Sequence, residues 1–252
     1  AIALALGEQA ARIEQFYADT GATIFQRDFR APRPGWFFRL GAKYLKAKFS
    51  IQNLDADWLL RAKYKPEPFR AALGDFFGEK TIGQASHRLI VPAVDLIKGS
   101  PVVFKTHHLP NLFRDAVTTA VDVAMATSAA PTYFPPSAIG SGSGYTDGGL
   151  WANNPSIIAY AEACRIHERC RRPGIDPTFE MSEVRILSVG TGRLPYFKKT
   201  ALAAGILFWG ADFLEISGAA QSQGTNTTAE YLLSDRYSRI DFTIPSRSWS
   251  LD

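Results

Sequence analysis

An aspartate followed by two glycines is the part of this sequence that is most clearly arranged for chemistry. Asp147 comes at the end of an expected strand, and Gly148 and Gly149 allow the backbone to turn sharply before the next element. Asn153 and Asn154 follow, and Asn154 directly precedes a proline, which is typical of the capped start of a helix. A carboxylate held at such a strand end projects into the crevice where α/β proteins place their working residues. The alternative interpretation is that Asp147 only organises its own turn, because Asp and Gly are ordinary turn residues.

The serines and histidines of the chain lack the surroundings that nucleophilic or metal chemistry needs. Ser128 falls in an alanine-rich expected helix, and Ser143 lies in a Gly/Ser run that is typical of a flexible hairpin loop. His107 and His108 are adjacent in an extended stretch, so their side chains point to opposite faces and do not suit one shared metal ion. Residues 190–192, Gly-Thr-Gly after an expected strand, do not complete a dinucleotide-binding motif and indicate a tight strand–helix junction. We therefore expect no metal site.

The elements that must position Asp147 follow from hydrophobic periodicity and from proline and glycine punctuation. Helices are expected at residues 8–25, 62–76, 121–129, 154–171, 202–217 and 221–233, strands at 89–96, 101–104, 185–189 and 239–244, and a loop at 132–144. Alternating strands and helices predict an α/β fold with a mostly parallel sheet sandwiched by helices. We expect residues 1–252 to form a single domain. Residues 1–7 are apolar like the interior of a buried helix, which predicts that an upstream segment belongs to the same fold.

A basic and aromatic segment, residues 27–49, is the main shift in composition along the chain. Cations with interspersed aromatic side chains suit an anionic lipid interface, and the candidate docking residues are Arg30, Arg33, Trp36 and Arg39. The alternative is a solvated segment that packs its aromatic side chains on its own domain. The formal net charge of +4 suits an anionic surface without requiring a nucleic acid polymer as partner.

The overall composition narrows the class of protein further. With 46% hydrophobic and 21% charged residues, the 252-residue chain is neither disordered nor collagen-like. Its two cysteines, Cys164 and Cys170, have neither a metal-ligand spacing nor the pattern of a disulfide framework, which predicts reduced thiols in a cytosolic protein. The apolar run at residues 201–211 is shorter than the roughly 20 residues that a membrane span needs.

The Asp-Gly-Gly turn and its context resemble the patatin-like phospholipases. The matching stretches are residues 63–64, 66–69, 76–78, 89–93, 103–106, 126–136, 145–155 and 186–192, in the order in which the family has them. The resemblance implies a patatin-like fold and a Ser-Asp dyad in which Asp147 is the catalytic base. Gly148 and Gly149 would then shape its turn, and Asn153 and Asn154 would cap the next helix and orient the loop. It implies no organic cofactor.

One part of the family pattern is missing from these residues. The sequence contains no Gly-x-Ser-x-Gly elbow, and no glycine-rich oxyanion loop precedes residues 1–7. Those residues resemble the helix that comes after the elbow, which predicts a nucleophilic Ser about four residues before Ala1. We therefore expect the chain to be a patatin-like domain without its N-terminal strand, oxyanion loop and nucleophile elbow.

The resemblance also implies a function and a setting. It points to an acyl hydrolase of phospholipase A type that is cytoplasmic, peripheral to the membrane and acts on phospholipids at the membrane surface. Among the bacterial members, which the chain resembles most, some are phospholipase effectors in antiphage defence that a cyclic dinucleotide activates. The alternative is a catalytically inactive, lipid-binding or oligomerising domain, and the sequence leaves the oligomeric state open.

Overall fold

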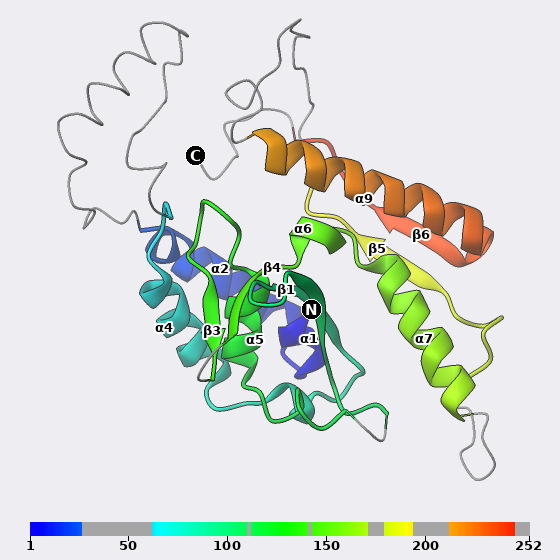
Figure 1. Ribbon diagram of the computed structural model, residues 1–252, viewed down its shortest axis with the longest axis horizontal. Coiled ribbons are helices and arrows are strands. Elements are labelled where there is room, and N and C mark those ends of the chain that lie inside the picture. Colours follow the sequence, from blue (N-terminus) through cyan, green and yellow to red (C-terminus); the bar gives the residue numbers. More distant parts are fainter. Residues whose placement is uncertain (27–61, 110–111, 141–142, 171–178, 194–211, 245–252) are drawn as a thin grey trace, which may run out of the picture. The chain divides into compact units, whose positions relative to one another are not determined.

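A computed structural model describes residues 1–26, 62–109, 112–140, 143–170, 179–193 and 212–244. The chain divides into two compact units, residues 1–148 and 149–252, whose helices and strands are labelled in Figure 1. The segment that contains Arg30, Arg33, Trp36 and Arg39 lies outside the described residues. The single domain expected over residues 1–252 stays a prediction.

The first unit is built around a four-stranded antiparallel sheet. Its strands are β1 (Ile90–Asp95), β2 (Ser100–Lys105), β3 (Ser137–Ile139) and β4 (Ser143–Asp147), in the order β2-β1-β4-β3. Its helices are α1 (Ile2–Ala5), α2 (Ala10–Ile24), α4 (Pro66–Phe77) and α5 (Ala120–Thr127), with a 3-10 turn at Ile82–Gln84. The β1–β2 hairpin that the sequence predicts is confirmed, with Ile90 paired to Lys105 and Asp95 to Ser100.

Local sequence explains where these elements begin and end. Pro66 is the first residue of α4, where its missing N–H costs no hydrogen bond, and Gly78 with φ +59° ends that helix. The Thr119 hydroxyl caps α5 by accepting the N–H of Asp122 at 3.1 Å. The buried carboxylate of Asp95 shapes the β1–β2 turn, because it accepts the N–H groups of the second and third residues after it, at 3.0 and 3.1 Å.

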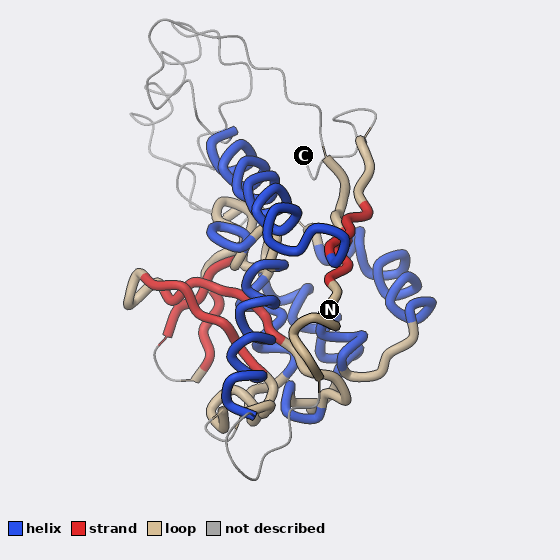
Figure 2. Tube along the Cα trace, turned by 90° about the vertical axis from the view of Figure 1, so that its right-hand side faces the viewer, coloured by secondary structure: helices blue, strands red, loops and turns tan. Residues whose placement is uncertain are grey.

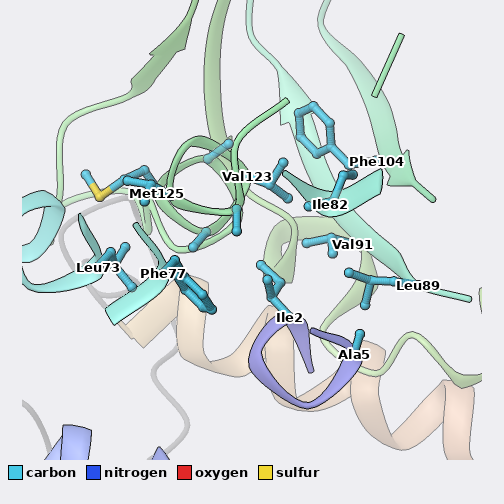
Figure 3. Close-up of a cluster of buried hydrophobic side chains, with 14 of the residues drawn as sticks. Ile2, Ala5, Leu73, Phe77, Ile82, Leu89, Val91, Phe104, Val123 and Met125 are labelled. Atoms are coloured by element: carbon cyan, nitrogen blue, oxygen red, sulfur yellow. The ribbon is translucent and has the colours of Figure 1, made fainter. Parts of the chain in front are cut away.

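The core of the first unit joins the sheet to α1, α4 and α5 (Figure 3). From the N-terminal helix, Ile2 and Ala5 are buried in this core, so the apolar character of residues 1–7 reflects packing, as the sequence indicates. Ile82 has no exposed surface and lies in the same cluster as Val91 and Val123. This packing fixes α5 against β1 and β4, the strands that carry the candidate site.

The second unit contains helices around a pair of parallel strands. It consists of α6 (Gly149–Ala152), α7 (Ser156–Cys170), β5 (Ile186–Val189), α9 (Asp212–Leu233), a 3-10 turn at Ser234–Arg236 and β6 (Tyr237–Ile240). Strands β5 and β6 pair in parallel, with Ile186 opposite Tyr237 and Val189 opposite Ile240. Ala229, Leu233 and Tyr237 form its buried apolar cluster.

The structure corrects three expectations from the sequence. The protein combines helices with strands (Figure 2), but among the described strands only β5 and β6 pair in parallel, so the mostly parallel sheet sandwiched by helices is not what these residues form. The short β1–β2 turn allows only antiparallel pairing, since parallel strands need a long crossover. The loop expected at residues 132–144 contains β3 and the start of β4, because short strands depend on their partners more than on local pattern. The break expected between residues 217 and 221 is absent, since α9 runs continuously through them.

Candidate active site

Asp147 is the last residue of β4 and lies opposite Ala93 of β1. It is half-buried, and its backbone N–H donates a hydrogen bond to the carbonyl oxygen of Ala129 at 3.0 Å. The hydroxyl of the preceding residue, Thr146, donates to the same oxygen at 2.6 Å. The candidate base is therefore held both by strand pairing with β1 and by the loop after α5.

Gly148 lies where no side chain can fit. A Cβ built on this glycine would stand 2.2 Å from the carbonyl oxygen of Pro92 and 2.5 Å from its carbonyl carbon. That carbonyl is itself fixed, because the hydroxyl of Thr127 donates to it at 2.7 Å. The sequence attributes this glycine to a sharp turn, whereas in the structure its φ is not positive and the close approach to β1 requires it.

The loop after α5, which contains Ala129, is itself held by hydrogen bonds and ring packing. Thr132 has φ +73°, which is unusual for a β-branched residue, and its carbonyl accepts the N–H of Lys63 at 2.8 Å. The carbonyl of Tyr133 accepts the N–H of Tyr64 at 2.8 Å, and the rings of Tyr64 and Phe134 pack with centroids 5.6 Å apart. Residues 126–136, which the sequence singles out only by resemblance, thus contact both the end of β4, through Ala129, and the segment at Lys63 and Tyr64.

The two asparagines after the turn contact other elements of the second unit. Asn153 donates from Nδ2 to the carbonyl oxygen of Gly218 in α9 at 3.1 Å. Asn154 is buried, and its Oδ1 accepts the N–H and the hydroxyl of Ser156 at 3.1 and 2.6 Å, as a residue capping α7 does. Its own N–H donates to Oε1 of Gln221 at 3.2 Å. The start of α7 is therefore attached to α9.

A buried carboxylate explains the Gly-Thr-Gly sequence after β5. The carboxylate of Asp241 accepts the N–H of Gly192 at 3.2 Å and forms ion pairs with Arg239 at 2.9 Å and Arg193 at 3.3 Å. A Cβ on Gly190 would stand 2.5 Å from its carboxyl carbon. Burial alone would raise the pKa of Asp241, but the hydrogen bonds from Arg239 and Phe242, with the charges of both arginines, lower it below its usual range. This loop binds an internal carboxylate, and the expected strand–helix junction stays a prediction, because residues 194–211 lie outside the described residues.

The serines and histidines that the sequence analysis considered lie in or next to regular elements or pack against neighbouring side chains. Ser128 is the residue that ends α5, and Ser143 begins β4. The ring of His107 packs on Phe113, and Nδ1 of His108 lies 2.8 Å from the hydroxyl oxygen of Thr106. Among the described residues, no cluster of three or more His, Cys, Asp or Glu side chains could hold a metal ion.

Sequence reasoning did not single out Thr146, Thr127 or Pro92. The Thr146 hydroxyl bonds to a residue 17 positions away in the chain, and the Thr127 hydroxyl to a residue 35 positions away. No local pattern reports such partners, because they are set by the packing of α5 on β1 and β4. The close approach at Gly148 is hidden from the sequence for the same reason.

Comparison with known proteins identifies the family. The family model "Patatin-like phospholipase" matches residues 1–160. The chain belongs to the patatin-like phospholipase family. A Vibrio cholerae protein named "cGAMP-activated phospholipase" is 31% identical over 99% of this chain and 68% of its own length. An Escherichia coli protein of the same name is 33% identical over 76% of this chain and 47% of its length. A potato (Solanum tuberosum) relative named "Probable inactive patatin-3-Kuras 1" is 27% identical over 73% of this chain and 51% of its length.

Within this patatin-like chain, the matched region contains the Asp147 turn, the loop after α5 and the first residues of α7. The chain spans about half to two thirds of the length of these relatives. Among the described residues, no helix is long and apolar enough to cross a membrane.

Proposed function

We propose that this chain is part of a serine-dependent acyl hydrolase that cleaves fatty-acyl esters of membrane phospholipids. The observation that carries the proposal is the position of Asp147 at the end of β4, within the region that matches the patatin-like family. Its backbone is fixed there by the hydrogen bond to Ala129 and by strand pairing with β1. A catalytic base must be held in a fixed geometry relative to its nucleophile, and a strand end fixed on two sides provides this.

In the proposed mechanism Asp147 is the base of a Ser-Asp dyad. The serine, contributed by a segment upstream of Ala1, attacks the acyl carbonyl carbon while its proton moves to the Asp147 carboxylate. Collapse of the tetrahedral intermediate breaks the ester C–O bond, and the lysolipid alcohol leaves with that proton. Water then attacks the acyl-enzyme while Asp147 takes one of its protons. Collapse of the second tetrahedral intermediate breaks the bond between the acyl carbon and the serine oxygen, and Asp147 returns the proton to that oxygen, which regenerates the serine and releases the fatty acid. Gly148 and Gly149 shape the turn, and Asn153 and Asn154 orient the loop between the turn and α7.

Adduct mapping and an Asp147→Asn variant test this assignment. The full-length protein, with and without cGAMP, is treated with a fluorophosphonate probe, which labels activated serines, and the adduct is mapped by mass spectrometry. We expect one adduct on a serine upstream of Ala1, and we expect Asp147→Asn to abolish ester hydrolysis while the melting temperature stays close to that of the wild type. Asp75→Asn, an exposed residue of α4, is the matched control. An active Asp147→Asn variant would show that the base is another residue.

A folded full-length protein without labelling or hydrolysis in either condition would favour the alternative of an inactive, lipid-binding or oligomerising domain. The name of the potato relative contains the word "inactive", so an inactive member of this family is a specific alternative. Liposome binding and the oligomeric state would then be the informative measurements.

A cyclic dinucleotide is the proposed activator, and antiphage defence the proposed setting. Support comes from the names of the bacterial relatives, which describe phospholipases activated by cGAMP. The expected result is that cGAMP raises the rate of phospholipid hydrolysis by the full-length protein. Hydrolysis that is already maximal without any nucleotide would contradict activation while leaving the hydrolase proposal intact.

Docking to the membrane from the cytoplasm is proposed for the basic and aromatic segment at residues 27–49. It rests on the alternation of cations and aromatic side chains around Arg30, Arg33, Trp36 and Arg39. Changing the three arginines to Gln should weaken binding to anionic liposomes at constant ionic strength. Unchanged binding would rule out this segment as the docking element.

A further inference from the structure

Two consecutive residues of β4 bond to a single carbonyl group. The hydroxyl of Thr146 donates to the carbonyl oxygen of Ala129 at 2.6 Å, and the N–H of Asp147 donates to the same oxygen at 3.0 Å. Thr146 and Ala129 are 4% and 3% exposed, so water does not compete freely for these groups. A carbonyl oxygen has two lone pairs, and the side chain of Thr146 and the backbone of Asp147 use both.

The accepting carbonyl is itself held in place. Ala129 comes after Ser128, whose N–H donates to the carbonyl oxygen of Ala124 in α5 at 3.1 Å and whose own carbonyl accepts the N–H of Ala130 at 2.8 Å. Two residues before Ala129, the Thr127 hydroxyl bonds to Pro92, the residue of β1 against which Gly148 lies. The position of the Ala129 oxygen is therefore set by the packing of α5 on the sheet. The hydrogen bond from Thr146 in turn sets the position of the end of β4, where Asp147 lies.

From this geometry we propose that Thr146 is a positioning residue for Asp147. Its hydroxyl keeps the end of β4 on the Ala129 carbonyl and so sets where the Asp147 carboxylate lies when it accepts a proton. The proposal rests on the proposed hydrolase function, since it concerns the base of that reaction.

Valine is the sharpest replacement because it matches the size of threonine and lacks the hydroxyl. A methyl group at the position of the hydroxyl would stand 2.6 Å from the Ala129 oxygen, well inside ordinary van der Waals contact. The strand end and the loop must then move apart, and the second bond to that oxygen, from the N–H of Asp147, lengthens. Serine keeps the hydroxyl and removes only a methyl group, so it should restore the position.

A matched control is available in the same unit. Thr106 is 5% exposed, and its hydroxyl accepts the N–H of Leu89 at 3.0 Å, far along the chain from the Asp147 turn. Thr106→Val therefore removes a threonine hydroxyl of equal burial from the first unit. Thr146→Ala is the fallback for a Thr146→Val protein that does not fold, because it removes the hydroxyl without placing a methyl group near the oxygen.

The experiment uses the full-length protein, with cGAMP present, and a soluble short-chain ester. We expect Thr146→Val to lower kcat by about 10- to 100-fold with KM within about twofold, since misplacement of a catalytic group by about 1 Å has effects of this size. The rate of fluorophosphonate labelling should fall by a similar factor. Thr146→Ser should recover most of kcat, and Thr106→Val should keep wild-type kcat per folded molecule.

The outcomes separate this proposal from the proposed function. An inactive wild type, or an active Asp147→Asn variant, would contradict the function or its base. With an active wild type and an inactive Asp147→Asn, a Thr146→Val kcat within twofold of the wild type would overturn the positioning role alone. An equal loss in Thr106→Val, or no recovery in Thr146→Ser, would overturn it as well, because the effect would then be general to the fold.

Discussion

Gly148 lies closer to β1 than any side chain allows, so replacing it by alanine perturbs the position of Asp147 directly. The added Cβ would be 2.2 Å from the carbonyl oxygen of Pro92, 2.5 Å from its carbonyl carbon and 2.9 Å from its Cβ. These atoms belong to a paired strand whose carbonyl already accepts a hydrogen bond from Thr127 at 2.7 Å. They cannot rotate away as a flexible side chain would.

The size of the effect is set by the overlap. Ordinary contact begins near 3.4 Å, so the turn and β1 must separate by about 1.2 Å at this point. Forcing an extra methyl group into a well-packed site costs about 1–3 kcal/mol of stability. A shift of about 1 Å in a catalytic group lowers the rate by about 100-fold. We therefore expect Gly148→Ala to lose both stability and most of its hydrolytic rate.

The assay compares Gly148→Ala with Gly144→Ala on the same strand. A Cβ on Gly144 would meet only a side-chain atom of Pro136 at 3.9 Å, so this variant should behave like the wild type. Urea unfolding gives the change in the free energy of unfolding, and kcat on a soluble ester gives the change in rate for the full-length protein. If Gly148→Ala matched Gly144→Ala in both measurements, the close approach to Pro92 would not constrain the turn, and the geometric argument would be refuted.

Three further predictions concern stability. The hydrogen bond from Lys80 at 2.7 Å, opposed by burial and aided by the charge of Arg12, lowers the pKa of Glu8. Ionised Glu8 therefore contributes to the free energy of unfolding at neutral pH, and this contribution is lost as the pH falls from the ordinary Glu pKa of about 4.3 through the lower pKa of the folded state. In urea unfolding, the difference in stability between wild type and Glu8→Gln should shrink from pH 7 to pH 3, and a difference that stays constant would contradict this. Asn154→Ala should cost about 1–2 kcal/mol in the same assay, because the cap of α7 is lost, and a neutral result would contradict the capping role. Ile82→Ala, at a fully buried position, should cost about 2–5 kcal/mol, whereas Ile97→Ala, 67% exposed, should cost under about 0.5 kcal/mol; equal losses would contradict the assignment of the core.

Elements with strong local signals were predictable. The helix at Ser156–Cys170 comes after an Asn-Pro start, α4 begins at a proline and ends at a glycine, and the β1–β2 hairpin has two β-rich runs around a glycine turn. In each case the residues that determine the element lie within it or next to it in the chain. That residues 1–7 have to be covered was also predictable, since an apolar helical turn cannot stay exposed, but the cover was expected from an upstream segment, whereas Ile2 and Ala5 are buried in the cluster that contains α4, α5 and the sheet.

Elements that depend on distant partners were not predictable. Strand β3 is three residues long and exists through its pairing with β4, and α9 continues through the break expected near Gly218. A glycine in a helix costs only about 1 kcal/mol, and contacts with neighbouring elements can outweigh that cost. The arrangement of strands was mispredicted because alternating elements favour parallel sheets on average, whereas the short turn after Asp95 requires antiparallel pairing.

For the candidate site, the sequence by itself determined the chemical groups: a carboxylate at Asp147, glycines at the turn, asparagines at a helix start, and a family resemblance that the comparisons confirm. Only the tertiary structure decided how Asp147 is held. The Ala129 carbonyl and the Pro92 carbonyl come from segments 18 and 55 residues earlier in the chain than Asp147, and they reach the turn because α5 packs on β1 and β4. Side-chain type is local information, whereas close contacts between distant segments arise only when the whole core is packed.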